Sequence, residues 1–175
     1  MSELVSAIKS TIRDVPDFPK PGILFKDITP VLARHDLMKD ITARFAEGCR
    51  DKKIDAVVGM ESRGFLFGVP LAMHLGIPFV PARKPGKLPY HKVSESYALE
   101  YGSATLELHT DALARGQRAL IVDDLIATGG TALATAKLVE RLGAEVAGFG
   151  FVIELAFLDG RKVLGNYTVD SIVAY

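Results

Sequence analysis

Residues 119–131 read ALIVDDLIATGGT, and this stretch gives the clearest indication of the fold. Its first four residues are apolar without a break, which is typical of a short strand buried on both faces of a sheet. Two aspartates and a glycine pair follow, and a helix is expected from about Thr131 to Leu142, where Gly143 ends it. A strand, a loop and a helix in this order indicate an α/β sheet that binds its ligand beyond the carboxyl ends of the strands.

Short apolar runs alternate with helical stretches on both sides of this segment. We therefore expect one α/β domain over residues 1–175, with a central, mainly parallel sheet flanked by helices. The expected strands cover 56–60, 78–80, 146–155 and 168–173, and the expected helices cover about 4–12 behind an N-cap at Ser2, 36–52 and 65–74.

The charges of the chain balance, with 21 basic and 21 acidic side chains. The overall field therefore favours neither a nucleic acid nor a membrane as a partner. The single cysteine, Cys49, cannot form an internal disulfide and fits a small apolar position on a helix. Because no signal peptide and no apolar run long enough for a bilayer are evident, we expect a cytoplasmic location.

The residues after strand 119–122 suit a phosphorylated sugar. A glycine pair lets the backbone turn sharply, and the start of the next helix, with the hydroxyls of Thr128 and Thr131, forms a cradle for a monophosphate. Asp123 and Asp124 would repel a phosphate but can accept hydrogen bonds from the vicinal hydroxyls of a ribose. Each part alone is compatible with a solvated strand end or an ordinary turn. Together, in this order, they predict a ribose 5-phosphate site.

This arrangement resembles the motif with which type I phosphoribosyltransferases bind phosphoribosyl pyrophosphate (PRPP). The resemblance implies their fold, with a small N-terminal helix and hood over about residues 1–35 and a flexible β-hairpin loop at about 84–101. It also implies that Asp123 and Asp124 bind the ribose hydroxyls of PRPP. The residues that would hold the 5-phosphate are Ala127, Thr128, Gly129, Gly130 and Thr131.

A second motif, Glu61-Ser62-Arg63-Gly64-Phe65, follows the expected strand at 56–60 and should reach the same edge of the sheet. Its arginine and free amides suit another anion, although Arg63 pairing with a surface carboxylate is the plainer alternative. The motif resembles one in the adenine phosphoribosyltransferase family. That resemblance implies that Glu61, Ser62 and Arg63 form part of a pyrophosphate site, with a cis peptide bond between Glu61 and Ser62.

The densest cationic stretch, residues 83–92, opens a long polar segment from Lys84 to Ser96. A solvated basic loop is one interpretation, but a departing pyrophosphate needs cations, and a mobile loop can deliver them while excluding water. Alternation in 97–101 and 104–108 predicts a hairpin around Gly102-Ser103. By resemblance, pyrophosphate would be bound by Arg83, Lys84 and Lys87, with Arg83 or a neighbour acting across a dimer interface.

Base recognition is predicted from the resemblance rather than from the residues themselves. The segments 17–19, 21–22 and 25–28 match the hood of the adenine enzymes. This match implies an adenine site formed by Leu24, Phe25, Lys26 and Leu155. The family more often has arginine where this chain has Lys26, so the resemblance does not extend to a clamping role for that side chain.

Glu100 lies in a Leu-Glu-Tyr-Gly sequence that the same family shares. Adenine N9 must lose its proton as it bonds to the ribose, and a carboxylate can accept that proton directly or tune the ring through N7. The resemblance therefore implies a catalytic Glu100, with Tyr101 covering the site. An exposed hairpin charge is the alternative. Mg²⁺ is expected as cofactor and should be held mainly through PRPP, because the sequence has no evident carboxylate cage for it.

These motifs lead to one expected activity: transfer of the 5-phosphoribosyl group from PRPP to N9 of adenine, giving AMP and pyrophosphate, by a homodimeric enzyme. An enzyme for a 6-oxopurine is the alternative within the class, and discrimination at the 6-position separates the two. A PRPP-sensing module that has lost turnover is the alternative outside it. His35, His74 and His109 receive no role.

Overall fold

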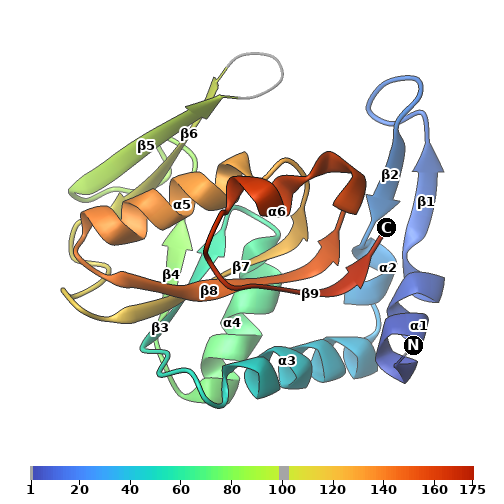
Figure 1. The fold of residues 1–175 in the computed structure, drawn as a ribbon, viewed down its shortest axis with the longest axis horizontal. Coiled ribbons are helices and arrows are strands. Elements are labelled where there is room, and N and C mark those ends of the chain that lie inside the picture. The colour runs from blue at the N-terminus through green and yellow to red at the C-terminus, as the bar shows by residue number, and fades with distance from the viewer. Residues whose placement is uncertain (1, 99–102) are drawn as a thin grey trace.

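The computed structural model describes residues 2–98 and 103–175. At its centre lies a five-stranded parallel sheet with the strand order β4-β3-β7-β8-β9 (Figure 1). The strands are β3 (Ala56–Met60), β4 (Phe79–Ala82), β7 (Arg118–Ile126), β8 (Glu145–Glu154) and β9 (Val169–Ala174). This is the predicted parallel α/β fold, and each of the apolar runs expected to form strands contributes to the sheet.

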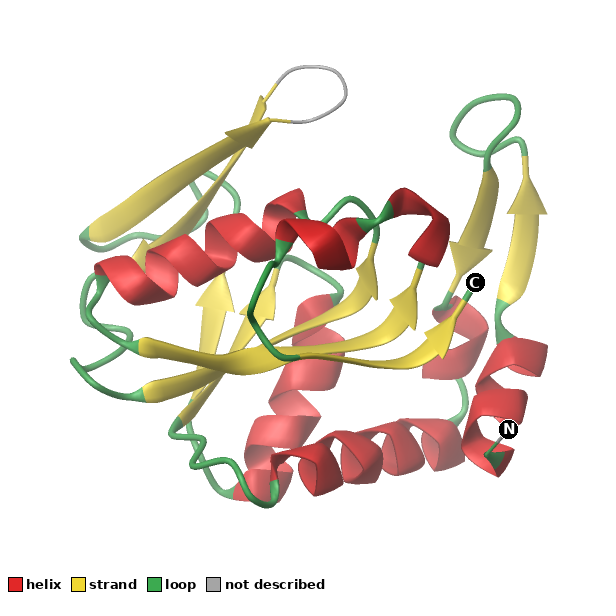
Figure 2. Cartoon of the chain, viewed as in Figure 1, coloured by secondary structure: helices red, strands yellow, loops and turns green. Residues whose placement is uncertain are grey.

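Helices cover both faces of the sheet, as Figure 2 shows. α3 (His35–Cys49) and α4 (Gly64–Leu75) pack on one face, and α5 (Gly130–Arg141) packs on the other. Successive strand residues point to opposite faces, so Leu120 joins the core under α3 and α4 while Ile121 joins the core under α5. The strands are therefore buried on both sides, which is why they read as unbroken apolar runs.

The N-terminal segment forms a small unit beside the end of the sheet. α1 (Glu3–Thr11) begins after Ser2, whose hydroxyl accepts a hydrogen bond from the Val5 amide at 3.4 Å, as the N-cap prediction requires. β1 (Arg13–Pro16) and β2 (Leu24–Asp27) pair antiparallel, and the short α2 (Thr29–Leu32) leads into α3. In Figure 1 this hairpin stands close to β9 and the C-terminus.

The second hairpin differs from the expectation. β5 (Lys92–Ala98) pairs with β6 (Ser103–His109), so the strand begins at Lys92 and not at Tyr97. The polar residues that suggested a loop are strand residues, because Glu95 forms ion pairs with α5 and Ser96 bonds across to Thr105. The expected turn at Gly102-Ser103 and the end of the first strand fall partly on residues 99–102, outside the described residues.

Two further differences concern helices. α3 ends at Cys49 rather than near Lys52, because the Arg50 amide already bonds to Glu47 in a tighter turn. A 3₁₀ turn, η1 (Ala156–Leu158), and α6 (Gly160–Val163) follow β8 where no helix was predicted. Over the described part of the chain, every helix is too short or too polar to span a membrane.

Candidate active site

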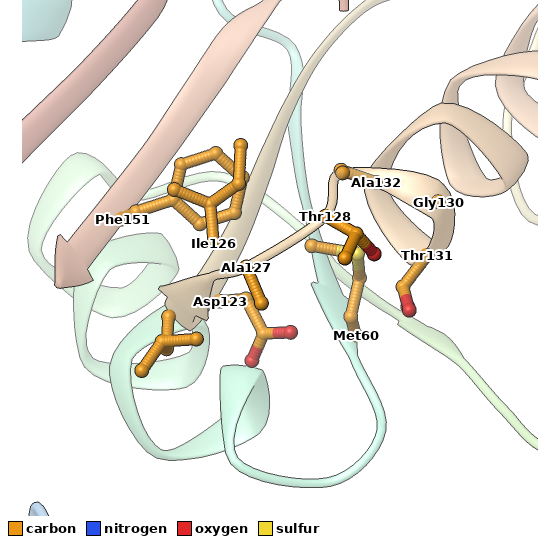
Figure 3. Close-up of a pocket in the computed structure, with 11 residues that line it drawn as sticks. Met60, Asp123, Ile126, Ala127, Thr128, Gly130, Thr131, Ala132 and Phe151 are labelled. Atoms are coloured by element: carbon orange, nitrogen blue, oxygen red, sulfur yellow. The ribbon is translucent and has the colours of Figure 1, made fainter. Parts of the chain in front are cut away.

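The predicted phosphate loop lies where β7 meets α5. β7 continues to Ile126, so both aspartates belong to the strand, and residues 127–129 alone form the loop before α5. Figure 3 shows the hollow at this point, with Asp123, Thr128 and Thr131 among the side chains that line it. Gly129 adopts φ +82°, a conformation that favours glycine. The end of β7, the loop and the start of α5 thus present amides, two hydroxyls and one carboxylate to the same small space.

The two aspartates at the end of β7, Asp123 and Asp124, have different partners. Asp124 is only 3% exposed, and its Oδ2 lies 2.9 Å from Nε of Arg63. Asp123 lines the hollow, and its Oδ1 accepts a hydrogen bond from the Asp124 amide at 2.8 Å. Burial and the charge of Asp124 raise the pKa of Asp123, and burial also raises the pKa of Asp124 against the opposing effect of Arg63.

The loop after β3, residues 61–63, reaches the same edge, as predicted. We call it the arginine loop. The Glu61–Ser62 peptide is cis, which confirms that expectation. A Cβ on Gly64 would lie 2.5 Å from the carbonyl oxygen of Val122, so only glycine allows α4 to start this close to β7. That close approach brings Arg63 onto Asp124 and joins two motifs separated by about sixty residues.

The Glu61 carboxylate binds the segment after β4. Its Oε2 accepts a hydrogen bond from the Lys84 amide at 2.7 Å and lies 3.2 Å from Nε of Arg83. Burial alone would raise the pKa of Glu61, but the Lys84 amide and the Arg83 guanidinium outweigh it, and the pKa is lowered. Glu61 is therefore an anionic partner of Arg83. The side chains of Lys84 and Lys87 are exposed beyond it.

The hood faces the arginine loop through one aromatic ring. The Phe25 ring centroid lies 5.9 Å from the Arg63 guanidinium and packs edge-on against Phe18. Leu24 is 52% exposed. Lys26 has a different position: its Nζ lies 2.6 Å from Oδ1 of Asp14 and 4.2 Å from the ring centroid of Tyr175. Leu155 directly follows the carboxyl end of β8. The other two predicted site residues, Glu100 and Tyr101, lie outside the described residues.

One contact near the loop was not predicted. Thr131 Oγ1 donates a hydrogen bond to the Tyr97 hydroxyl at 3.0 Å, linking β5 to the first turn of α5. Tyr97 directly precedes the Ala-Leu-Glu-Tyr-Gly segment in the sequence, so its neighbourhood was visible, but its partner was not. Local spacing cannot indicate which helix a hairpin packs on.

A phosphate cradle, a carboxylate pair and two arginines therefore meet at one edge of a parallel sheet. This combination defines a class of proteins that bind a phosphorylated ribose together with a second anionic group.

Comparison with known proteins agrees with this class. Residues 31–171 match the model of the phosphoribosyl transferase domain family. The chain is 54% identical over 168 residues to the adenine phosphoribosyltransferase of Acaryochloris marina, covering 96% of this chain and 99% of that protein. The crystal structure of the Thermoanaerobacter pseudethanolicus adenine phosphoribosyltransferase superposes with a TM-score of 0.95 at 52% identity, covering 98% and 99% of the two chains. The chain belongs to the adenine phosphoribosyltransferase family.

A structure from Saccharomyces cerevisiae relates the family to its ligands. That adenine phosphoribosyltransferase was crystallised with adenine and D-2,5-dideoxy-2,5-imino-altritol 1,6-bisphosphate. It superposes with a TM-score of 0.94 at 42% identity, covering 99% of this chain and 100% of the yeast chain.

Proposed function

We propose that this protein transfers the 5-phosphoribosyl group from PRPP to N9 of adenine, releasing pyrophosphate and forming AMP. The contact between Arg63 and Asp124 carries this proposal. It joins the loop suited to pyrophosphate with the strand that leads into the phosphate cradle, so that a ribose can lie between two anion sites. The yeast relative, crystallised with adenine and a bisphosphate, supports the same pairing of ligands.

PRPP would bind with its 5-phosphate on residues 127–131. The free amides at the start of α5 and the hydroxyls of Thr128 and Thr131 supply donors without a cationic side chain. Asp123 and Asp124 would accept hydrogen bonds from the two ribose hydroxyls. Asp123 already faces the hollow, and ribose binding at Asp124 would compete with Arg63 for that carboxylate.

The pyrophosphate would lie against the arginine loop. Ser62 and Arg63, with Arg83, Lys84 and Lys87, would bind its oxygens, while Glu61 holds Arg83 in place. These groups neutralise the charge that builds on the leaving group as the C1–O bond breaks.

The site fits a metal that arrives with the substrate. Among the described residues no group of three or more His, Cys, Asp or Glu is placed to hold a metal ion. Of the carboxylates described at this edge, Asp124 is paired with Arg63 and Glu61 with Arg83, whereas Asp123 faces the hollow. Mg²⁺ bound mainly through PRPP agrees with this donor set, because the ion commonly uses one or two carboxylates plus substrate phosphates. When bound, it would supply further neutralisation of the pyrophosphate.

Adenine would lie under the hood, between Leu24 and Phe25 on one side and Leu155 on the other, with the Lys26 backbone toward its ring nitrogens. The N9–C1 bond forms as pyrophosphate leaves, and the N9 proton passes to Glu100. Residues 84–101, which include strand β5 and Tyr101, would act as the segment that covers the reactants. Residues 1–35 would act as the hood of the same single domain.

The test is purified protein with PRPP and Mg²⁺, offered adenine, hypoxanthine, guanine or no base, with nucleotide and pyrophosphate both measured. We expect AMP and pyrophosphate in equal amounts with adenine alone. Product from a 6-oxopurine would contradict the base assignment, and PRPP binding without product from any base would favour a sensor.

We also infer a homodimer from the outer face of α4. Leu66, Val69 and Met73 are exposed there at helical spacing, with Met73 78% exposed. An apolar stripe of this kind favours association with another surface. Light scattering should give the mass of a dimer for the unaltered protein and for Met73→Leu, and that of a monomer for Met73→Glu. A monomeric unaltered protein would contradict the inference. The cytoplasmic location expected from the sequence remains a prediction.

A further inference from the structure

The short helix after β8 touches the back of the phosphate loop. A Cβ on Gly160, the first residue of α6, would lie 2.1 Å from the Ala127 carbonyl oxygen and 3.0 Å from the Gly129 amide nitrogen. A Cβ on Gly129 would in turn lie 2.4 Å from the Gly160 carbonyl oxygen. Both positions lack a side chain where two backbone segments are in direct contact.

This contact gives the loop two sides with different neighbours. One side faces the hollow lined by Asp123, Thr128 and Thr131, as Figure 3 shows. The other side rests on the backbone at Gly160, which is buried. Because the loop binds through backbone amides, its position sets where those amides point, and α6 limits that position.

α6 is itself fixed to the sheet by Arg161. Its Nε donates to Oε1 of Glu154 at 3.0 Å, and its Nη1 donates to the Val169 carbonyl oxygen at 2.7 Å. Nη2 donates to the Glu154 carboxylate and, at 3.0 Å, to the Ser171 hydroxyl. The hydrogen bond from Arg161 lowers the pKa of Glu154, so the partner is a carboxylate at neutral pH. One guanidinium thus ties α6 to the ends of β8 and β9.

We propose that Gly160 and Arg161 are positioning residues for the 5-phosphate loop, acting through α6 rather than through contact with PRPP. A series of contacts, from Glu154 to Arg161 and from Gly160 to Gly129, holds the loop amides in the geometry that a phosphate needs. The identity of that phosphate rests on the proposed function. Substitutions in α6 should therefore weaken phosphate binding at the loop after β7 and leave pyrophosphate binding at the arginine loop unaffected.

The test compares two probes, ribose 5-phosphate and inorganic pyrophosphate, by calorimetry on the intact protein. Gly160→Ala should weaken ribose 5-phosphate binding by about tenfold or more, since a displacement of about 1 Å in a binding group has large effects. Pyrophosphate binding should change by less than about twofold, because Arg63 and Arg83 do not contact α6 in any described interaction.

Gly165→Ala is the matched control. Gly165 follows α6 at φ +56° with open space around a Cβ, so its substitution strains the backbone without touching the loop. It should leave the binding of both probes unchanged. Arg161→Gln, an exposed substitution, should reproduce the selective loss in a weaker form, and Arg161→Lys should restore part of the affinity.

Unchanged ribose 5-phosphate affinity in Gly160→Ala, or an equal loss of both probes, would overturn the inference. The proposed function is judged separately by the unaltered protein, which must form AMP from adenine and PRPP. An active protein whose Gly160→Ala variant keeps its affinity would contradict only the role of α6.

Discussion

The loop after β7 and the loop after β3 lie at the same edge of one sheet, yet they offer different groups to an anion. The first presents amides and hydroxyls and is fixed between the sheet and α6. The second presents Arg63, whose partner is Asp124, beside Arg83, whose partner is Glu61. A neutral loop needs fixed geometry to bind a phosphate, whereas a charged loop needs a carboxylate partner until its ligand arrives.

This difference suits the two ends of PRPP. The 5-phosphate stays bound through the reaction, so a rigid cradle of dipoles is sufficient for it. The pyrophosphate gains charge and then leaves, so exchangeable guanidinium partners suit it better. Substitutions in the two regions should therefore give separable defects.

The largest effect should follow Gly129→Ala. A side chain at φ +82° is strained, and its Cβ would meet the Gly160 carbonyl oxygen at 2.4 Å. The kcat/KM for PRPP should fall on the order of 100-fold, because the loop amides must move. Steady-state kinetics with adenine saturating would measure this.

Gly116→Ala is the control for that variant. Gly116 has φ +81° with nothing near a Cβ, so it carries the conformational strain without the contact. Its kcat/KM should match the unaltered protein. A similar fall in both variants would mean that strain, and not the contact with α6, determines the defect.

Arg63→Gln should have the next largest effect. Losing a charged hydrogen-bond donor to the pyrophosphate should lower kcat/KM about 10- to 100-fold. Pyrophosphate affinity should fall in parallel while ribose 5-phosphate affinity is retained. Arg34→Gln, which removes only an exposed ion pair with Asp36, should leave all three quantities unchanged. Equal losses of both ligands in Arg63→Gln would break the distinction between the two regions.

Asp123→Asn should lower activity and raise stability. Burial and the charge of Asp124 raise the pKa of Asp123, so the folded state binds this proton more tightly than the unfolded chain. The contribution of the Asp123 carboxyl group to the free energy of unfolding is therefore complete below its unfolded pKa. That contribution is lost as the pH rises through its folded pKa. The variant should lose about tenfold in kcat/KM, since one ribose acceptor is weakened.

Melting curves across the pH range would measure the stability effect. Asp123→Asn should melt above the unaltered protein at neutral pH, and the difference should shrink in acid. A lower melting temperature at neutral pH would show that the ionised carboxylate stabilises the ligand-free fold, contrary to its assigned environment.

Lys26→Met should have the smallest effect. The ammonium group pairs with Asp14 and lies over the Tyr175 ring, so it is committed within the hood and is not free for a base. The KM for adenine should change by less than about threefold, as expected for the loss of a partly exposed ion pair. Lys26→Arg should behave like the unaltered protein. A tenfold rise in the KM of the methionine variant would assign the side chain to base binding.

The sequence predicted the parts of the fold that are encoded locally. Unbroken apolar runs identified the buried strands, and Ser2 and the glycine pair at the start of α5 marked helix starts. The meeting of the two loops followed from the rule that parallel strands end at one edge. The hairpin strand from Lys92 was missed, because its exposed polar residues are ordered by pairing with β6 and by ion pairs to α5.

The supports of the site could not be predicted in the same way. α6 has four residues, too few to show a helical period, and Gly160 has no motif that points to the phosphate loop. The pairing of Lys26 with Asp14 also depends on the register of β1 and β2. These features arise from contacts between distant segments, and only the folded chain specifies them.

The reverse reaction is the most direct test of phosphoribosyl transfer by this protein. AMP and pyrophosphate would be supplied with Mg²⁺, and the release of adenine and formation of PRPP would be followed. We expect equal amounts of both products, a strict requirement for pyrophosphate, and no release of hypoxanthine from IMP. Adenine release without pyrophosphate would mean that water attacks the ribose and that the arginine loop is not a pyrophosphate site. No adenine release under any condition would contradict phosphoribosyl transfer itself.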